Sequence, residues 1–161
     1  MEKLITYRIA ESRDDFKISK DLIVEYLETL HIDLAYMNLP SEFSTMEQKY
    51  VEPEGAFILA LNEEDKAVGC VGLRKSGSEI AELKRLYVKD SYRGYKIGVT
   101  LVQKASEKAR ILGYEKIRLD VIPTLLKAKE LYYSLGFYEI QPYFKSPVEG
   151  TAYMEKKLKE E

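Results

Sequence analysis

The sequence has little of the residue types that carry much of enzyme chemistry. Its 161 residues include one cysteine (Cys70), one histidine (His31) and no tryptophan. A single cysteine forms no internal disulfide, and a single histidine provides neither a Ser-His-Asp set nor a histidine metal cluster. Cys70 lies in the apolar run AVGCVGL, which is typical of a buried thiol. The composition therefore predicts that no metal is bound and that any chemistry uses other side chains.

Charge and hydropathy exclude further classes of protein. The formal net charge is -2 with both signs mixed along the chain, whereas nucleic-acid-binding proteins usually show a basic face. No signal peptide is evident, and no apolar stretch is long enough to span a bilayer. A chain of 161 residues suffices for one domain with a sizeable core. We therefore expect a single cytoplasmic domain over residues 1–161, with neither a nucleic acid nor a membrane as partner.

The hydrophobic pattern predicts strands and helices in a clear order. Helical spacing indicates helices over 14–30 and 97–112, a weaker one over 42–50, and a last one around Ala128–Leu135. A turn is expected at 76–78. Strands are expected at 5–10, 56–61, 67–75, 80–88, 116–122, 137–144 and 151–158. Antiparallel strands followed by two strand-helix units predict an α/β fold with a sheet of mixed direction.

The segment YRGYKIG (92–98) joins a predicted strand to a predicted helix. The first turn of a helix has free N–H groups and the positive end of the helix dipole, and Gly94 and Gly98 would let a ligand approach the backbone closely. The spacing fits neither a G-x-x-x-x-G-K-[ST] phosphate loop nor a G-x-G-x-x-G dinucleotide fingerprint. The segment is a candidate phosphate or pyrophosphate site, although a tight turn with solvated Arg93 and Lys96 explains the same residues.

The loop YRGYKIG is followed downstream by the segment KAKELYYSLGF. Together these two motifs resemble the GNAT superfamily of acyl-CoA-dependent N-acetyltransferases. YRGYKIG is similar to the family's loop [QR]-x-x-G-x-[GA], with Arg93 first, Gly98 last and Lys96 in place of the usual middle glycine. Leu125 stands where the family often has asparagine. The order of elements also fits from Ile5 to Leu158, nearly the whole chain. KAKELYYSLGF resembles the family's A-x-x-L-Y-x-x-x-G-F helix through Ala128, Leu131, Tyr132, Gly136 and Phe137.

The resemblance implies a fold and a co-substrate. The GNAT acyl-CoA N-acyltransferase fold is a mixed, mostly antiparallel sheet of six to seven strands with about four helices, in which a central parallel pair, here 80–88 and 116–122, splays apart. ELKRLYV and PYFKSPVEG also resemble a subgroup of small bacterial acetyltransferases with unassigned substrates. Acetyl-CoA would place its pantetheine arm along the first strand and its pyrophosphate on the following loop. The implied cofactor-binding residues are Leu86, Tyr87, Val88, Arg93, Gly94, Tyr95, Lys96, Ile97, Gly98 and Val99.

Amine acetylation requires an acid, a base and a donor to the carbonyl oxygen. An alkyl ammonium has a pKa near 10.4, so a group must accept its proton, directly or through water. The leaving thiolate gains from a nearby acid. The resemblance implies Tyr132 as that acid, because a phenol stays protonated at pH 7; without the resemblance, Tyr132 would simply be a core aromatic. The main-chain N–H of Tyr87 or Val88 is a candidate donor to the oxyanion.

Glu82 is the candidate base. It stands at the start of the strand that enters the cofactor loop, and it matches the catalytic glutamate of the histone-acetylating branch of the family. Other members work through a water wire, and a structural carboxylate paired with Lys84 or Arg74 is the alternative reading. Glu79 is a weaker candidate for the same role.

The expected function is transfer of acetyl from acetyl-CoA to a primary amine by direct attack in a ternary complex. A non-catalytic acyl-CoA-binding or sensing module on the same fold is the alternative. The acceptor is a small-molecule or protein amine, in a pocket that residues 14–50 and 146–150 are expected to shape, and Tyr143 either lines this pocket or only packs. The resemblance leaves a homodimer open. A cationic acceptor would suit the acidic residues of the first segment, unless they are solvated helix faces: Glu25, Glu28, Asp33, Glu42 and Glu47.

Overall fold

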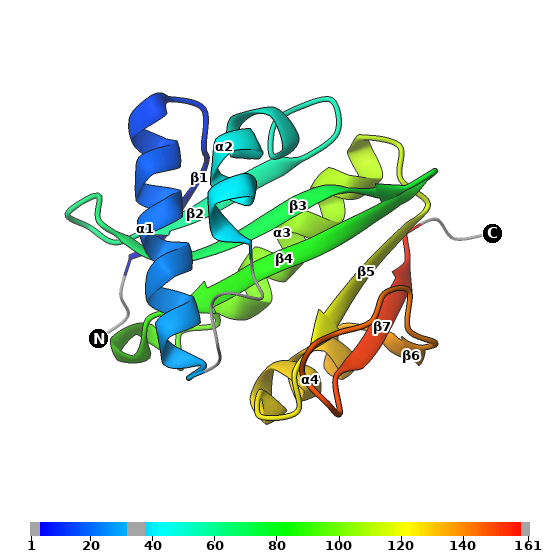
Figure 1. Ribbon diagram of the computed structural model, residues 1–161. Helices are drawn as coiled ribbons and strands as arrows, with labels where there is room; N and C mark the ends of the chain where they lie inside the picture. The colour runs from blue at the N-terminus through cyan, green and yellow to red at the C-terminus, as the bar shows by residue number, and fades with distance from the viewer. Residues whose placement is uncertain (1–3, 32–37, 159–161) are drawn as a thin grey trace.

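The computed structural model describes residues 4–31 and 38–158, so Asp33 lies outside the described residues (Figure 1). Within these ranges one seven-stranded sheet forms the centre, in the order β1-β2-β3-β4-β5-β7-β6. Neighbouring strands are antiparallel except for β4 and β5, which run parallel. The strands are β1 (Thr6–Ile9), β2 (Ala56–Leu61), β3 (Ala67–Gly77), β4 (Ile80–Val88), β5 (Lys116–Val121), β6 (Tyr138–Ile140) and β7 (Ala152–Lys157). This confirms the predicted α/β sheet of mixed direction.

Helices cover both faces of the sheet. Figure 1 shows α1 (Arg13–Thr29) and α2 (Leu39–Lys49) on one face and α3 (Ile97–Ile111) on the other. The fourth described helix, α4 (Leu126–Ser134), shares a hydrophobic cluster with α3 and the sheet. A second cluster lies between the sheet and the first two helices. No helix in the described ranges is long and apolar enough to cross a membrane.

Local chemistry explains where α1 and α2 begin. Ser12 caps α1 by accepting a hydrogen bond from the Asp15 N–H at 3.0 Å, while the Asp15 carboxylate accepts from the Ser12 N–H at 3.4 Å. α2 begins at Leu39, earlier than predicted from Glu42. Pro40 falls in its first turn, where the missing N–H costs no helical hydrogen bond.

Two predicted strand ends also differed from the structure by two residues or more. β3 continues to Gly77, which pairs with Ile80, so the turn is Ser78–Glu79 rather than 76–78. Glu79 adopts a left-handed backbone there, with φ of 63°. β6 ends at Ile140 instead of reaching 144, because Pro142 has no N–H to continue a ladder.

The parallel pair is short and opens into a fork. β4 and β5 are paired only from Ile80 with Lys116 to Glu82 with Arg118, and beyond this point the two strands diverge (Figure 1). This confirms the predicted splayed pair. The fork points toward the end of β4 that leads into α3.

A β-bulge bends β4 just beyond the last parallel pair. Cys70 pairs with Tyr87 and Gly72 with Lys84, so one residue of β3 faces two residues of β4. Arg85, in the bulge, has a left-handed backbone with φ of 60°. Its carbonyl accepts a hydrogen bond from the fully buried Cys70 thiol at 3.3 Å. The extra residue increases the local bend of the strand, and Cys70 is a core thiol as predicted.

Candidate active site

A cavity of about 1060 Å³ opens at the fork. Its walls come from the second half of β4, the end of β5 and the amino-terminal ends of α3 and α4. Residues of α1 and α2 and of the segment 144–148 complete it on the opposite side. The cavity therefore joins the predicted cofactor loop to the predicted acceptor region.

The loop that precedes α3 presents backbone N–H groups to this cavity. The first hydrogen bond within α3 is from the Thr100 N–H to the Lys96 carbonyl at 3.1 Å, so the N–H groups of Ile97, Gly98 and Val99 precede the helical ladder. Lys96 is the N-cap, and its side chain makes no capping hydrogen bond. The turn thus keeps its donors available for an anion.

The backbone of Lys96 differs from expectation. Because Lys96 stands where the predicted helix begins, an ordinary helical φ was expected for it. Its φ is instead 60° and its ψ is 23°, in the left-handed region. A side chain at such a position is strained relative to glycine. This backbone conformation favours the glycine that the family usually has at this position. Lys96 therefore adopts a conformation that is unfavourable for a residue with a side chain.

Most of the predicted cofactor residues line the cavity. Tyr95 does not, and this residue is 40% exposed. Arg93 is held by an ion pair with Asp90 at 2.7 Å and by its Nε donating to the Val88 carbonyl at 3.3 Å. The residues that line the cavity are Leu86, Tyr87, Val88, Arg93, Gly94, Lys96, Ile97, Gly98 and Val99.

Tyr132 lies on α4 and reaches the same cavity. Its residue is 6% exposed, and its ring packs on Phe137 with a centroid distance of 5.6 Å. Burial raises the pKa of the Tyr132 phenol well above its ordinary value, and nearby Tyr26 and Asp120 add to the rise. Tyr132 is therefore a neutral hydroxyl at neutral pH, both a core aromatic and a cavity residue.

Glu82 lies beside the fork, but it is not among the residues that line the cavity. Its Oε1 accepts from Arg74 at 3.0 Å and its Oε2 accepts from the Tyr143 hydroxyl at 2.8 Å. Although burial raises the pKa of Glu82, Lys84, Arg74 and the Tyr143 hydrogen bond together hold it below its ordinary value. These contacts are the structural pairing that the sequence left open, and they leave Glu82 a weak proton acceptor.

Sequence reasoning missed Asp120, Lys84 and Tyr26 as cavity residues. Burial raises the pKa of Asp120, which Lys84 partly offsets. The alternation in KIRLDVI does put Asp120 on the polar face of its strand. Only the register of β4 on β5, however, shows that Lys84 lies opposite Asp120.

The acidic residues of the first helices are largely paired with cations. Glu42 lines the cavity, but Arg85 Nη2 donates to both of its oxygens at 3.0 and 3.1 Å. Glu25 pairs with Lys89 at 3.6 Å and Glu47 pairs with Lys20 at 3.4 Å. Carboxylates compensated in this way do not give the cavity an acidic character, so they do not single out a cationic acceptor.

The sheet order, the fork and the cavity define the acyl-CoA N-acyltransferase fold. An acetyltransferase of the GNAT family from Staphylococcus aureus Mu50 superposes with a TM-score of 0.80 and 24% identity, over 97% of this chain and 100% of that one. PaiA N-acetyltransferase from Thermoplasma acidophilum, solved in complex with coenzyme A, gives a TM-score of 0.68 and 21% identity over 94% and 99%.

Similarity of sequence identifies the family as well as the fold. The model of the acetyltransferase (GNAT) family matches residues 23–137. An uncharacterised N-acetyltransferase of Schizosaccharomyces pombe is 37% identical over 148 residues, which is 91% of this chain and 89% of that protein. The chain belongs to the acetyltransferase (GNAT) family.

Proposed function

We propose that the chain transfers an acetyl group from acetyl-CoA to a primary amine by direct attack in a ternary complex. The observation that carries the proposal is that one cavity is lined both by the loop before α3 and by Tyr132 at the fork. A co-substrate in that cavity would have its phosphates at one end and its thioester at the other. The coenzyme A bound to the similar PaiA N-acetyltransferase supports the same choice of co-substrate.

The free edge of β4 suits a pantetheine arm. Past Glu82 and Arg118 the edge of β4 that faces β5 has no strand partner, and an extended amide chain can pair with such an edge as an added strand would. Acetyl-CoA would then lie along Leu86–Val88, with its pyrophosphate on the N–H groups of Ile97–Val99 and near the cations Arg93 and Lys96.

The direction of the strand's N–H groups selects one oxyanion donor. The Lys89 N–H donates to the Val68 carbonyl at 2.9 Å, toward β3. Because successive N–H groups along a strand point to opposite edges, the Val88 N–H points into the fork and the Tyr87 N–H points back to β3. Val88 is therefore the better placed of the two donors proposed for the developing negative charge on the carbonyl oxygen.

Tyr132 is proposed as the acid that protonates the leaving thiolate. Tyr132 lines the cavity, and its phenol stays protonated at pH 7 because burial raises its pKa. The base can be reached by two routes. Glu82 would reach the amine only through intervening water, since its two oxygens are held by Arg74 and Tyr143, and a chain of waters without Glu82 is the alternative for this step.

Two measurements test the proposed function. Calorimetry is expected to show acetyl-CoA binding in the micromolar range without added metal, in competition with CoA. Free thiol release from acetyl-CoA is then followed with a panel of small-molecule amines and peptide amines. Binding with no amine-dependent thiol release would favour the acyl-CoA-sensing module over the enzyme. No binding would contradict both, and loss of activity on chelation with recovery on adding metal would contradict the metal-free mechanism.

A further inference from the structure

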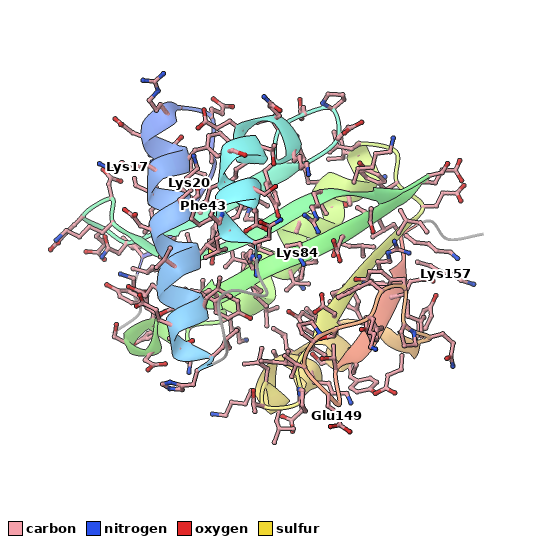
Figure 2. All side chains as sticks on the ribbon, viewed as in Figure 1. Lys17, Lys20, Phe43, Lys84, Glu149 and Lys157 are labelled. Carbon is pink, nitrogen blue, oxygen red and sulfur yellow. The ribbon has the colours of Figure 1, made fainter. Side chains whose placement is uncertain are left out.

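Lys84 and Asp120 face each other where the two strands of the fork separate. The last parallel pair is Glu82 with Arg118, so a step of two residues along each strand brings Lys84 and Asp120 to the same face of the sheet. Lys84 Nζ lies 3.9 Å from Asp120 Oδ1, and the side chains are 17% and 22% exposed. Figure 2 shows Lys84 on the face that carries α1 and α2. The pair spans the opening of the fork.

Asp120 differs from Glu82 in what surrounds it. Asp120 lines the cavity together with Tyr132 of α4 and Tyr26 of α1, whereas Glu82 does not. Its ion pair with Lys84 is longer than a hydrogen bond, so a polar ligand can take the place of that contact at little cost. Glu82, in contrast, would have to give up two short hydrogen bonds.

We propose that Asp120 binds the ammonium group of the acceptor and accepts its first proton, a role that rests on the proposed acetyl transfer. The proton passes from the nitrogen to the Asp120 carboxylate and later leaves to solvent through the cavity. The neutral amine attacks the thioester carbon, and the C–S bond breaks as Tyr132 gives its proton to sulfur. The second proton on nitrogen then passes to the Tyr132 phenolate and restores the phenol. The sum is an amide, a free thiol and one released proton.

The electrostatics of Asp120 suit this role. Burial raises its pKa and Lys84 opposes the rise, with a net shift upward, and a base is more effective as its pKa moves toward the working pH. Lys84 is then a positioning residue, because it keeps part of Asp120 ionised without touching the reacting atoms. Several titratable and charged groups act on or face Asp120. They are Lys84, Glu82 and Arg85 of β4, Tyr26 of α1, Tyr132 of α4, Tyr143 after β6 and Tyr153 of β7, which is the cross-strand neighbour of Asp120.

Nucleophiles with different pKa values test the assignment. A primary alkylamine must lose a proton before attack, whereas hydroxylamine is largely unprotonated at pH 7. Asp120→Asn should lower kcat/KM for the alkylamine by roughly 100-fold or more, and for hydroxylamine by no more than about fivefold. The alkylamine rate should recover as the pH rises and the free amine becomes abundant. Acetyl-CoA affinity, measured by calorimetry, should stay within about twofold, because the phosphates bind elsewhere.

Controls separate a chemical role from a structural one. Asp120→Glu keeps the carboxylate and should retain most of the alkylamine activity, while Asp21→Asn changes an exposed aspartate of α1 and should change neither rate. Equal losses with both nucleophiles, or no loss with either, would overturn the assignment of Asp120. A wild-type chain that releases no thiol with any nucleophile would instead overturn the proposed function, and this proposal with it.

Lys84→Met provides a second test if Asp120→Asn does not fold. Lys84 lowers the pKa of Asp120, so its loss raises that pKa further and reduces the ionised fraction at any given pH. The acid limb of the alkylamine rate profile should therefore move to higher pH, while the hydroxylamine profile stays in place. An alkylamine limb that does not move would count against Asp120 as the base.

Discussion

The Tyr143 hydroxyl donates a hydrogen bond to Glu82 Oε2 at 2.8 Å, across 61 residues of sequence. The bond fixes the segment after β6 to the middle of the sheet, and the Arg118 guanidinium supports the same ring at 3.8 Å from its centroid. Residues just beyond Tyr143, including Ser146 and Val148, line the cavity. Glu82 thus helps to position one wall of the cavity, on the side proposed for the acceptor.

Tyr143→Phe should loosen this wall and leave the rest of the protein intact. A hydrogen bond to a charged group is worth about 1.5–3 kcal/mol, so the free energy of unfolding in urea should fall by roughly that amount. Tyr138→Phe is the matched control, because Tyr138 donates to Glu155 at an exposed site; its effect should stay within about 0.5 kcal/mol. Equal losses in the free energy of unfolding for Tyr143→Phe and Tyr138→Phe would contradict the role given to the Tyr143–Glu82 hydrogen bond.

Glu82→Gln should reduce stability in a pH-dependent way. The pKa of Glu82 is lowered on folding, so its charge stabilises the fold above the unfolded pKa near 4.3. That contribution is lost as the pH falls through the lower folded pKa. Wild type should therefore exceed the variant by roughly 1–3 kcal/mol at pH 7, and the gap should close at acid pH.

The same Glu82→Gln variant also tests the second candidate base. The Glu82 charge raises the pKa of Asp120. With Asp120 accepting the proton, the acid limb of the alkylamine rate profile should therefore stay in place or move to lower pH. A profile displaced toward higher pH would restore Glu82, acting through water, as the base.

Tyr132→Phe should separate chemistry from binding. The ring is retained, so the fold and most of the acetyl-CoA affinity should be retained too, while turnover falls by roughly 10- to 1000-fold. Tyr133→Phe is the control, because Tyr133 is exposed and donates to Glu139 at 2.7 Å. The measurement is steady-state thiol release with the amine that gives the highest wild-type rate. If Tyr132→Phe turns over at the wild-type rate, Tyr132 is a packing residue only.

Lys96→Gly should make the protein more stable and bind acetyl-CoA slightly less well. Glycine relieves the left-handed backbone at this position, with an expected gain of about 1 kcal/mol in the free energy of unfolding. Loss of the charge should weaken binding about two- to fivefold at low salt and hardly at all at high salt. Lys96→Ala loses the same charge without the backbone relief, so it should show the weaker binding alone. Tighter binding by Lys96→Gly would mean that the lysine obstructs the site.

Gly98→Val should nearly abolish acetyl-CoA binding without unfolding the protein. A Cβ at Gly98 would meet Leu131 Cδ2 at 3.6 Å and Val88 Cγ2 at 3.9 Å, which are ordinary contacts. The cost should therefore fall on the ligand, whose pyrophosphate is proposed to approach this turn. Calorimetry and thermal melting measure the two effects separately, with Gly98→Ala as an intermediate. Normal binding by Gly98→Val would place the anion site elsewhere.

The sequence predicted most of the elements because their hydrophobic periods are strong. β4 was bounded correctly at Ile80 and Val88, and α3 was extended by one residue beyond Ile111. The backbone of Lys96 was not predicted, because no local pattern marks a left-handed lysine at a helix N-cap.

The site was predicted less fully than the fold, because its contacts join distant segments. The motif on α4 pointed to Tyr132, which lines the cavity. The polar alternation around Asp120, in contrast, is that of any half-exposed strand. Only the register of β4 on β5 brings Lys84 opposite it. In the same way, Tyr143 binds Glu82 through a segment that was predicted as a strand and is not one.

The fork also gives the sheet an edge at its centre. Unpaired backbone groups on a strand normally invite a strand from another molecule, which is how many sheets aggregate. Here the exposed groups of β4 face a cavity enclosed by α1, α2, α4 and the segment 144–148. A second polypeptide strand, with side chains on both faces, would collide with these walls. We therefore expect these walls to shield the edge from strands of other molecules while leaving room for a slender extended chain, such as the proposed pantetheine arm.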